Sequence, residues 1–186
     1  DLPHTFPGKI TKLLWERFNF FNGDKTKGLK FIPVELIEKN GDKLKSAIIK
    51  YSKLWKLPEE FEDWINNYNY FSNTLVDRIV TGYPKDEIEK IHKTIGFKDE
   101  LVVASELFHL FVIEADEEVK RSFPADKFGF NLKYTNDITP YRTQKVRILN
   151  GAHTCMVPIG LYNDIETVGD SLNNIQIESF INDLIY

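Results

Sequence analysis

The sequence has few of the side chains from which covalent cross-links and metal sites are built. Its single cysteine, Cys155, rules out an internal disulfide and a cage of thiolates. Cys155 lies in an apolar stretch with helical spacing, which favours a packing role and is typical of a reducing compartment. The 4 histidines are far apart, and none has another at i+3 or i+4, so we expect no metal site.

The sequence also lacks a long apolar run and an excess of positive charge. No stretch approaches the roughly 20 apolar residues that cross a bilayer, and the first residues lack the basic and apolar regions of a signal peptide. The 24 basic and 28 acidic residues give a net charge of −4, which disfavours binding along a phosphate backbone. We therefore expect neither a membrane nor a nucleic acid as partner, and a cytoplasmic location.

Motifs of three common enzyme classes are absent. The sequence contains no G-x-G-x-x-G turn, no G-x-x-x-x-G-K-[ST] loop and no G-x-S-x-G elbow, so neither a complete nucleotide-phosphate loop nor a serine hydrolase has support. The chain begins at Asp1 without a methionine and stops at Tyr186 inside an amphipathic pattern. We expect it to be part of a longer protein.

One stretch does combine side chains that acid–base chemistry uses. Lys145, Asn150 and His153 lie in an apolar run with helical spacing. At about 100° per residue, Asn150 is expected roughly 140° and His153 roughly 80° around the helix from Lys145, so all three can face one cleft. A lysine beside neutral hydrogen-bonding groups in a partly dry site can lose its proton and act as a base. Spacing alone favours the simpler alternative, a surface lysine and a histidine with structural partners.

The first part of the chain alternates helices and strands. Apolar residues recur at helical spacing from Ile10 to Phe21 and again over residues 44–55. Between them, residues 29–35 are short, apolar and non-periodic, as a buried strand is, although Pro33 favours an edge or a strand end. In such a unit ligands bind beyond the carboxyl ends of strands, so the loop over residues 35–41 is a candidate site wall. The alternative is a solvated turn shaped by its Asn-Gly pair.

Two polar features interrupt the apolar segments that follow. The sequence predicts a helix over residues 58–68, an apolar segment over 70–80, a short helix over 85–95, and strands over 107–113 and 128–134. Asp77 and Arg78 lie inside the second of these, where a structural ion pair or an edge position is the alternative to a site role. His109 lies in the first strand, and we expect it to be a satisfied structural residue more readily than a ligand.

The pattern changes from mixed α/β to helical near residue 139. Helical spacing runs from Pro140 to Pro158 and again from Gly169. The sequence therefore predicts an α/β domain over residues 1–138, followed by the first helices of an all-α domain over residues 139–186.

Three segments together resemble the polyol-specific long-chain dehydrogenase, or mannitol dehydrogenase, family. They are PVELIEKNG at residues 33–41, SNTLVDRIVTGYP at 72–84 and KVRILNGAHT at 145–154. The likeness is greatest to the tagaturonate reductase (altronate oxidoreductase) branch, and it covers nearly the whole chain in order. Each segment alone is moderately specific, and the three together are strongly so.

The resemblance implies an NAD-dependent oxidoreductase that interconverts D-tagaturonate and D-altronate, with a small-molecule hexuronate or aldonate as partner. The first domain would be a Rossmann-type NAD-binding domain with a mixed sheet, and its glycine-rich turn would lie upstream of Asp1. The family pattern K-x-x-x-x-N-x-x-H falls on Lys145, Asn150 and His153. It implies that Lys145 is the general acid and base, that Asn150 polarises the substrate oxygen, and that His153 binds substrate or orients the lysine.

The resemblance implies roles for three further residues. Asn40 would assist Asn150 at the substrate oxygen, and Asp77 matches an acid near the substrate in related enzymes. Polyol dehydrogenases tend to carry glutamate three residues before the lysine, where this chain has Arg142. An arginine there suits an anionic uronate. The alternatives are a fructuronate reductase, a polyol dehydrogenase, or a non-catalytic module in which the Lys145 group is structural.

Overall fold

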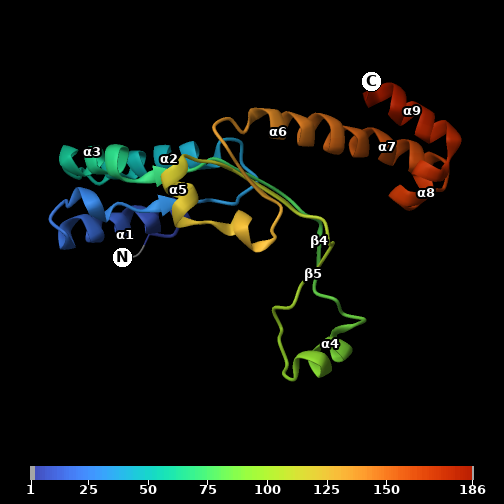
Figure 1. Cartoon of the computed structure of the whole chain (residues 1–186), viewed down its shortest axis with the longest axis horizontal. Helices are drawn as coiled ribbons and strands as arrows, with labels where there is room; N and C mark the ends of the chain where they lie inside the picture. The colour runs from blue at the N-terminus through green and yellow to red at the C-terminus, as the bar shows by residue number, and fades with distance from the viewer. Residues whose placement is uncertain (1–2, 186) are drawn as a thin grey trace. The chain divides into compact units, whose positions relative to one another are not determined.

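The computed structural model describes residues 3–185, which form two compact units divided in sequence between Asn136 and Asp137. The first unit contains helices α1 to α5 and strands β1 to β7, and the second contains helices α6 to α9 (Figure 1).

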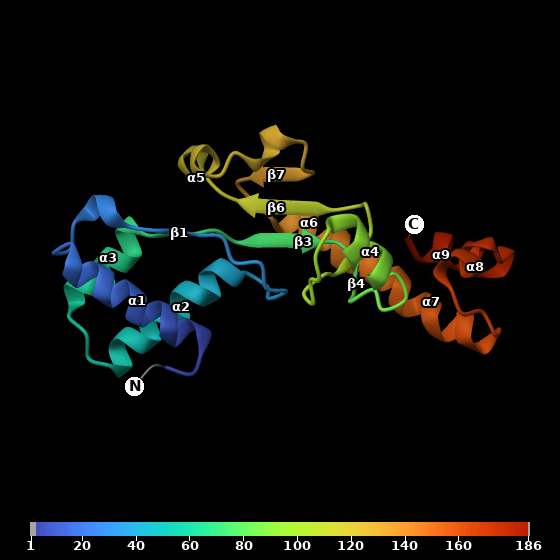
Figure 2. The same ribbon diagram turned by 90° about the horizontal axis from the view of Figure 1, so that it is seen from below.

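Three helices of the first unit pack around an apolar core (Figure 2). They are α1 (Phe6–Phe20), α2 (Asn40–Leu54) and α3 (Glu59–Tyr68), and the three predicted helices are thus confirmed. α1 begins before its first predicted apolar position because Thr5 caps it, accepting a hydrogen bond from the Gly8 N–H at 3.2 Å. The helices enclose a set of buried side chains, namely Leu14, Leu44, Ile48, Phe61, Trp64 and Ile65.

The described strands are shorter than predicted. β1 (Lys30–Phe31) pairs in parallel with β2 (Tyr70–Phe71). The predicted strand over residues 29–35 is therefore wrong beyond Phe31, because Pro33 has no N–H with which to continue a ladder. The predicted segment over residues 70–80 is divided among β2, β3 (Thr74–Asp77) and β4 (Val80–Gly82), since each finds a different partner strand.

A second, mixed sheet lies beside the first pair (Figure 2). β6 (Leu110–Glu114) is its central strand, antiparallel to β3 and parallel to β7 (Leu132–Thr135). The predicted strand over residues 128–134 is confirmed at its end, where Leu132 is buried against the sheet. The other predicted strand begins at Leu110 rather than Leu107, whose side chain is 95% exposed.

Between β3 and β6 the chain leaves the central sheet and forms α4 (Ile88–Ile95) before it returns (Figure 1). Its stem is the antiparallel pair of β4 and β5 (Ala104–Ser105). The Arg78 guanidinium closes the base of the stem, with Nε 3.0 Å and its terminal nitrogen 2.8 Å from the Glu106 carbonyl oxygen. The stem explains why residues before Leu110 lie outside the central sheet.

His109 is a structural residue, as expected. Its Nε2 accepts a hydrogen bond from the Asn131 N–H at 2.9 Å, which places the proton on Nδ1. Nδ1 lies 3.2 Å from the Leu107 carbonyl oxygen. Both ring nitrogens are therefore used within the protein.

A tyrosine and an aspartate tie β2 to α5 (Glu117–Ser122). Asp116 caps α5 by accepting hydrogen bonds from the Glu118 and Val119 N–H groups, each at 2.9 Å. The Val119 N–H, followed by the Tyr70 hydroxyl, lowers the pKa of Asp116. The hydrogen bond to Asp116, followed by burial, raises the pKa of Tyr70 to about 12. The link is thus formed by a neutral tyrosine and a charged aspartate.

The second unit begins with one continuous helix that changes type. α6 (Thr139–Thr143), a π-helical segment (Gln144–Asn150) and α7 (Gly151–Tyr162) follow without a break, since the junction residues keep right-handed helical torsions. The helix continues past its predicted end at Pro158, whose φ suits a helix although its ring removes one hydrogen bond. The lost bond therefore did not end α7.

The predicted helix from Gly169 is two helices in the structure. α8 (Val168–Asn173) and α9 (Ile175–Ile185) are separated at Asn174, whose backbone is extended. The Asn174 Oδ1 accepts from the Gln176 N–H at 3.0 Å and starts α9. Met156, Ile177 and Ile181 form the core of this unit. Within residues 3–185, no helix is both long and apolar enough to span a membrane.

Candidate active site

The π-helical segment contains two of the three residues of the K-x-x-x-x-N-x-x-H pattern. A π-helix is marked by hydrogen bonds that run from an N–H to the carbonyl five residues back, and such turns are frequent at functional sites. The Gly151 N–H, at the end of the segment, donates to the Val146 carbonyl and also to the Ile148 carbonyl. Lys145 lies inside the segment, Asn150 at its last position and His153 in the first turn of α7.

This geometry changes the angular positions expected for a regular α-helix. Residues five apart in a π-helix stand about one turn apart, so Asn150 lies roughly 50° from Lys145 instead of roughly 140°. His153 follows Asn150 by three residues of ordinary α-helix, which turns it back by roughly 60°. All three side chains therefore start from one face, and the prediction that they share a face is sharpened.

The side chains on this face differ in their exposure and in their hydrogen bonds. Lys145 and His153 are half-buried, whereas Asn150 is exposed. The amide of Asn150 and the ring of His153 make no hydrogen bond with any residue between Pro3 and Ile185. An uncommitted amide and imidazole next to a lysine can bind the hydroxyl and carbonyl oxygens of a small polar molecule.

Arg142 stands close to this face. It is half-buried in α6, three residues before Lys145, a spacing at which helical side chains are neighbours. A guanidinium there adds a second cation and five N–H donors in a planar fork, which match a carboxylate.

Asn40 lies in the first unit and is one of its most strongly hydrogen-bonded side chains. Its Nδ2 lies 3.1 Å from the carbonyl oxygens of Pro33 and Glu35 and 2.9 Å from the Thr74 Oγ1. Its Oδ1 accepts from the Gly41 and Thr74 N–H groups at 2.9 and 2.8 Å. An amide has two N–H donors and two acceptor lone pairs, so these contacts use its whole capacity.

The Asn-Gly pair is not the solvated turn that was the alternative prediction. Asn40 is 4% exposed and begins α2, while Lys39 before it has the left-handed φ of 51°. A Cβ on Gly41 would lie 2.4 Å from the Ser72 carbonyl oxygen, so only glycine allows this approach of α2 to the end of β2. A pocket of about 250 Å³ opens beside Asn40, and its mostly apolar walls include Phe6, Ile37 and Leu44 together with the charged residues Glu35 and Lys43.

Asp77 also lies in the first unit. It ends β3, opposite Leu110 of β6, and its side chain is half-buried. Its neighbour Arg78 is committed to the Glu106 carbonyl oxygen. No group of three or more His, Cys, Asp or Glu side chains in the described part of the chain is placed to hold a metal ion.

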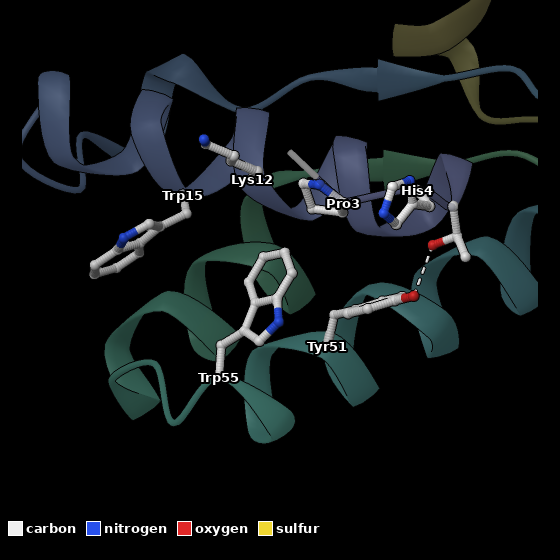
Figure 3. A pocket seen from close by; sticks show the side chains of 7 residues that line it. Pro3, His4, Lys12, Trp15, Tyr51 and Trp55 are labelled. Atoms are coloured by element: carbon white, nitrogen blue, oxygen red, sulfur yellow. Dashed lines mark hydrogen bonds between the residues drawn. The ribbon is translucent and has the colours of Figure 1, made fainter. Parts of the chain in front are cut away.

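A groove between α1 and α2 has no signal in the sequence (Figure 3). Its volume is about 610 Å³, and its walls include Lys12, Trp15 and Trp55. The Tyr51 hydroxyl and the Thr5 Oγ1, 2.6 Å apart, lie at one end of it. Tyr51 and Trp55 belong to the helical spacing over residues 44–55, and that spacing cannot distinguish a groove wall from a core. The groove contains none of the predicted site residues.

Two family models match the chain. Residues 4–126 match the mannitol dehydrogenase Rossmann domain, and residues 137–186 match the mannitol dehydrogenase C-terminal domain. An altronate oxidoreductase of Bacillus subtilis is 47% identical over 181 residues, which are 97% of this chain and 38% of that protein. An altronate oxidoreductase of Yersinia enterocolitica is 42% identical over 179 residues, which are 96% of this chain and 37% of that protein. The chain thus spans less than two fifths of the length of these relatives.

Two solved structures share the fold. A substrate-free D-sorbitol dehydrogenase has a TM-score of 0.73 at 22% identity. The match covers 96% of this chain and 35% of the sorbitol dehydrogenase chain. A Pseudomonas fluorescens mannitol 2-dehydrogenase, solved as a ternary complex with NAD and D-mannitol, has a TM-score of 0.63 at 23% identity, with 97% and 35% covered. The predicted fold class, a partial Rossmann-type domain with a mixed sheet followed by helices, is confirmed.

Proposed function

The chain belongs to the mannitol dehydrogenase family, and we propose that the full-length protein is an NAD-dependent oxidoreductase that interconverts D-tagaturonate and D-altronate. The resemblance predicted from the three sequence segments is confirmed. The observation that carries the proposal is the face of the π-helical segment, where Lys145, Asn150 and His153 stand together. The altronate oxidoreductases at 42–47% identity support the choice of substrate.

In this proposal, the chain's own residues move a proton at one substrate oxygen. Lys145 accepts the hydroxyl proton of altronate as the O–H bond breaks and the C=O bond forms, and it returns that proton in the reductive direction. NAD, when bound, supplies the acceptor for the hydride that leaves the same carbon. Asn150 donates a hydrogen bond to the oxygen, whose negative charge is greatest in the transition state. His153 binds a substrate hydroxyl or orients Lys145.

The first unit fits one end of the cofactor. β1 and β2 are parallel, and open α/β sheets bind nucleotides beyond the carboxyl ends of such strands. The mostly apolar pocket of about 250 Å³ beside Asn40 suits a flat, weakly polar ring. No glycine-rich phosphate turn occurs in the 186 residues, so we assign the pyrophosphate to no residue of this chain.

In this proposal Asn40 has a positioning role and does not contact the substrate. A direct hydrogen bond to the substrate oxygen, as the resemblance implies, would require one N–H to leave a backbone carbonyl or Thr74. We therefore infer that Asn40 holds the loop over residues 33–40 against β3, and that Asn150 is the amide at the substrate oxygen.

The substrate class follows from charge. Altronate and tagaturonate carry a carboxylate, and the guanidinium of Arg142 beside Lys145 matches it in charge and geometry. Asp77, half-buried at the end of β3, is proposed to accept hydrogen bonds from substrate hydroxyls.

The proposal is tested with the full-length protein and its Lys145→Ala variant. We expect kcat for NADH oxidation with tagaturonate to fall by roughly 10²–10⁴-fold, because the acid is removed, while NADH still binds. Arg147→Ala is the matched control, since it removes an exposed cation from the same segment. Retained activity in Lys145→Ala would refute the role of the lysine. A panel of tagaturonate, fructuronate and fructose separates the proposed substrate from those of a fructuronate reductase or polyol dehydrogenase.

A further inference from the structure

We propose that the π-helical segment is the positioning element of the active site, because it brings Asn150 and His153 onto the face of Lys145. This inference rests on the proposed function. It adds a structural cause for the site, namely one extra residue accommodated in one helical turn between Lys145 and Asn150.

The alignment depends on the spacing of Lys145 and Asn150 along the helix. Lys145 and Asn150 are five residues apart, and in a regular α-helix that spacing puts them on opposite sides, roughly 140° apart. The Gly151 N–H donates to the Val146 carbonyl, five residues back, so the turn is wider and takes up the additional residue. Asn150 then stands above Lys145 as residues four apart do in an α-helix. His153 keeps its place next to Asn150 through ordinary α-helical spacing in α7.

Within residues 3–185, apolar packing does not account for the wide turn. Val146, Ile148 and Leu149 are each 40–45% exposed, so burying an apolar face does not require the wider turn. Neither Gln144 nor Arg147 makes a side-chain hydrogen bond or ion pair with residues 3–185 that would hold it. The consequence of the turn that its geometry shows is the alignment of Lys145, Asn150 and His153.

A pair of single-residue deletions tests the alignment. Deletion of Arg147 shortens the spacing from Lys145 to Asn150 to four residues, so an α-helix keeps both on one face and His153 remains with them. Deletion of Gln144 removes the extra residue before Lys145, leaves five residues between Lys145 and Asn150, and turns Asn150 away by roughly 90°. It also shortens the spacing from Arg142 to Lys145 to two residues, and the Arg142→Ala variant is the control for that change. Both variants lose one exposed polar residue from the same segment, so they are matched in size and position.

The readouts are kcat with tagaturonate and NADH in the full-length protein, the melting temperature, and a crystal structure of each variant. We expect the Arg147 deletion to keep kcat within about tenfold of the wild type. The Gln144 deletion should lose roughly 10²–10³-fold, as expected when the donor at the oxyanion is removed. The crystal structures show, independently of activity, whether Lys145 and Asn150 share a face.

Three results would overturn the proposal. One is full activity in a variant whose structure shows Asn150 turned away from Lys145. Another is equal loss in the two deletions although both fold and only one keeps the shared face. The third is that the Gln144 deletion folds, whereas the Arg147 deletion and a second spacing-matched variant, the Ile148 deletion, both fail to fold. Each leaves the Lys145→Ala result untouched, so failure of the positioning idea is distinct from failure of the proposed function.

Discussion

Replacing Asn40 with alanine should lower the free energy of unfolding of the first unit more than replacing any of its exposed polar residues. The substitution removes the acceptor of the Gly41 and Thr74 N–H groups and the donor to the Pro33 and Glu35 carbonyls. A buried polar group left without a partner costs about 1–3 kcal/mol, and water can reach some of these groups. We therefore expect a loss of about 3–5 kcal/mol, which lowers the melting temperature of a domain of this size by roughly 10–17 °C.

The matched control for this experiment is Asn150→Ala. Its amide is exposed and makes no hydrogen bond with residues 3–185, so its loss should change stability by no more than about 0.5 kcal/mol. In the full-length protein it should instead lower kcat by roughly 10²–10³-fold. Melting temperatures and initial rates of both variants separate the two roles. An unchanged melting temperature in Asn40→Ala would refute the hydrogen-bond argument, and unchanged kcat in Asn150→Ala would refute the assignment at the oxygen.

Three further expectations follow from single side chains. Arg142→Ala should raise KM for tagaturonate by at least tenfold and leave KM for fructose nearly unchanged, whereas Arg147→Ala should change neither; equal effects on both sugars would contradict the carboxylate role. Phe61→Ala should destabilise the helical core by about 3–5 kcal/mol, measured by denaturant unfolding, because Phe61 is 0% exposed. Since the pKa of Tyr70 is raised to about 12, the wild type should lose stability as pH rises from about 10 towards 12, and Tyr70→Phe should lose less over that range in melting experiments.

The helices were predictable because their signals are local. In α1 and α2 the apolar residues recur at helical spacing over several turns, although the start of α1 after its Thr5 cap, ahead of Ile10, was not predicted. The strands were less predictable because a strand ends where its partner ends. Nothing in residues 70–80 shows that β2 pairs with β1 while β3 pairs with β6, since both partners are distant in sequence. The same limit applies to Asn40, whose burial depends on Thr74, 34 residues away.

The sequence predicted that Lys145, Asn150 and His153 share a helix, but it did not predict the type of helix. In a regular α-helix of 3.6 residues per turn, the separation of five residues leaves Asn150 roughly 140° around the axis from Lys145. A closer alignment requires either an interruption of the helix between Lys145 and Asn150 or an extra residue in one turn. The intervening residues, Val146 to Leu149, include no proline or glycine to interrupt a helix, which leaves the wider turn. The hydrogen bond from the Gly151 N–H to the Val146 carbonyl is the one that a wider turn requires, so the structure aligns Lys145 and Asn150 more closely than α-helical spacing predicts.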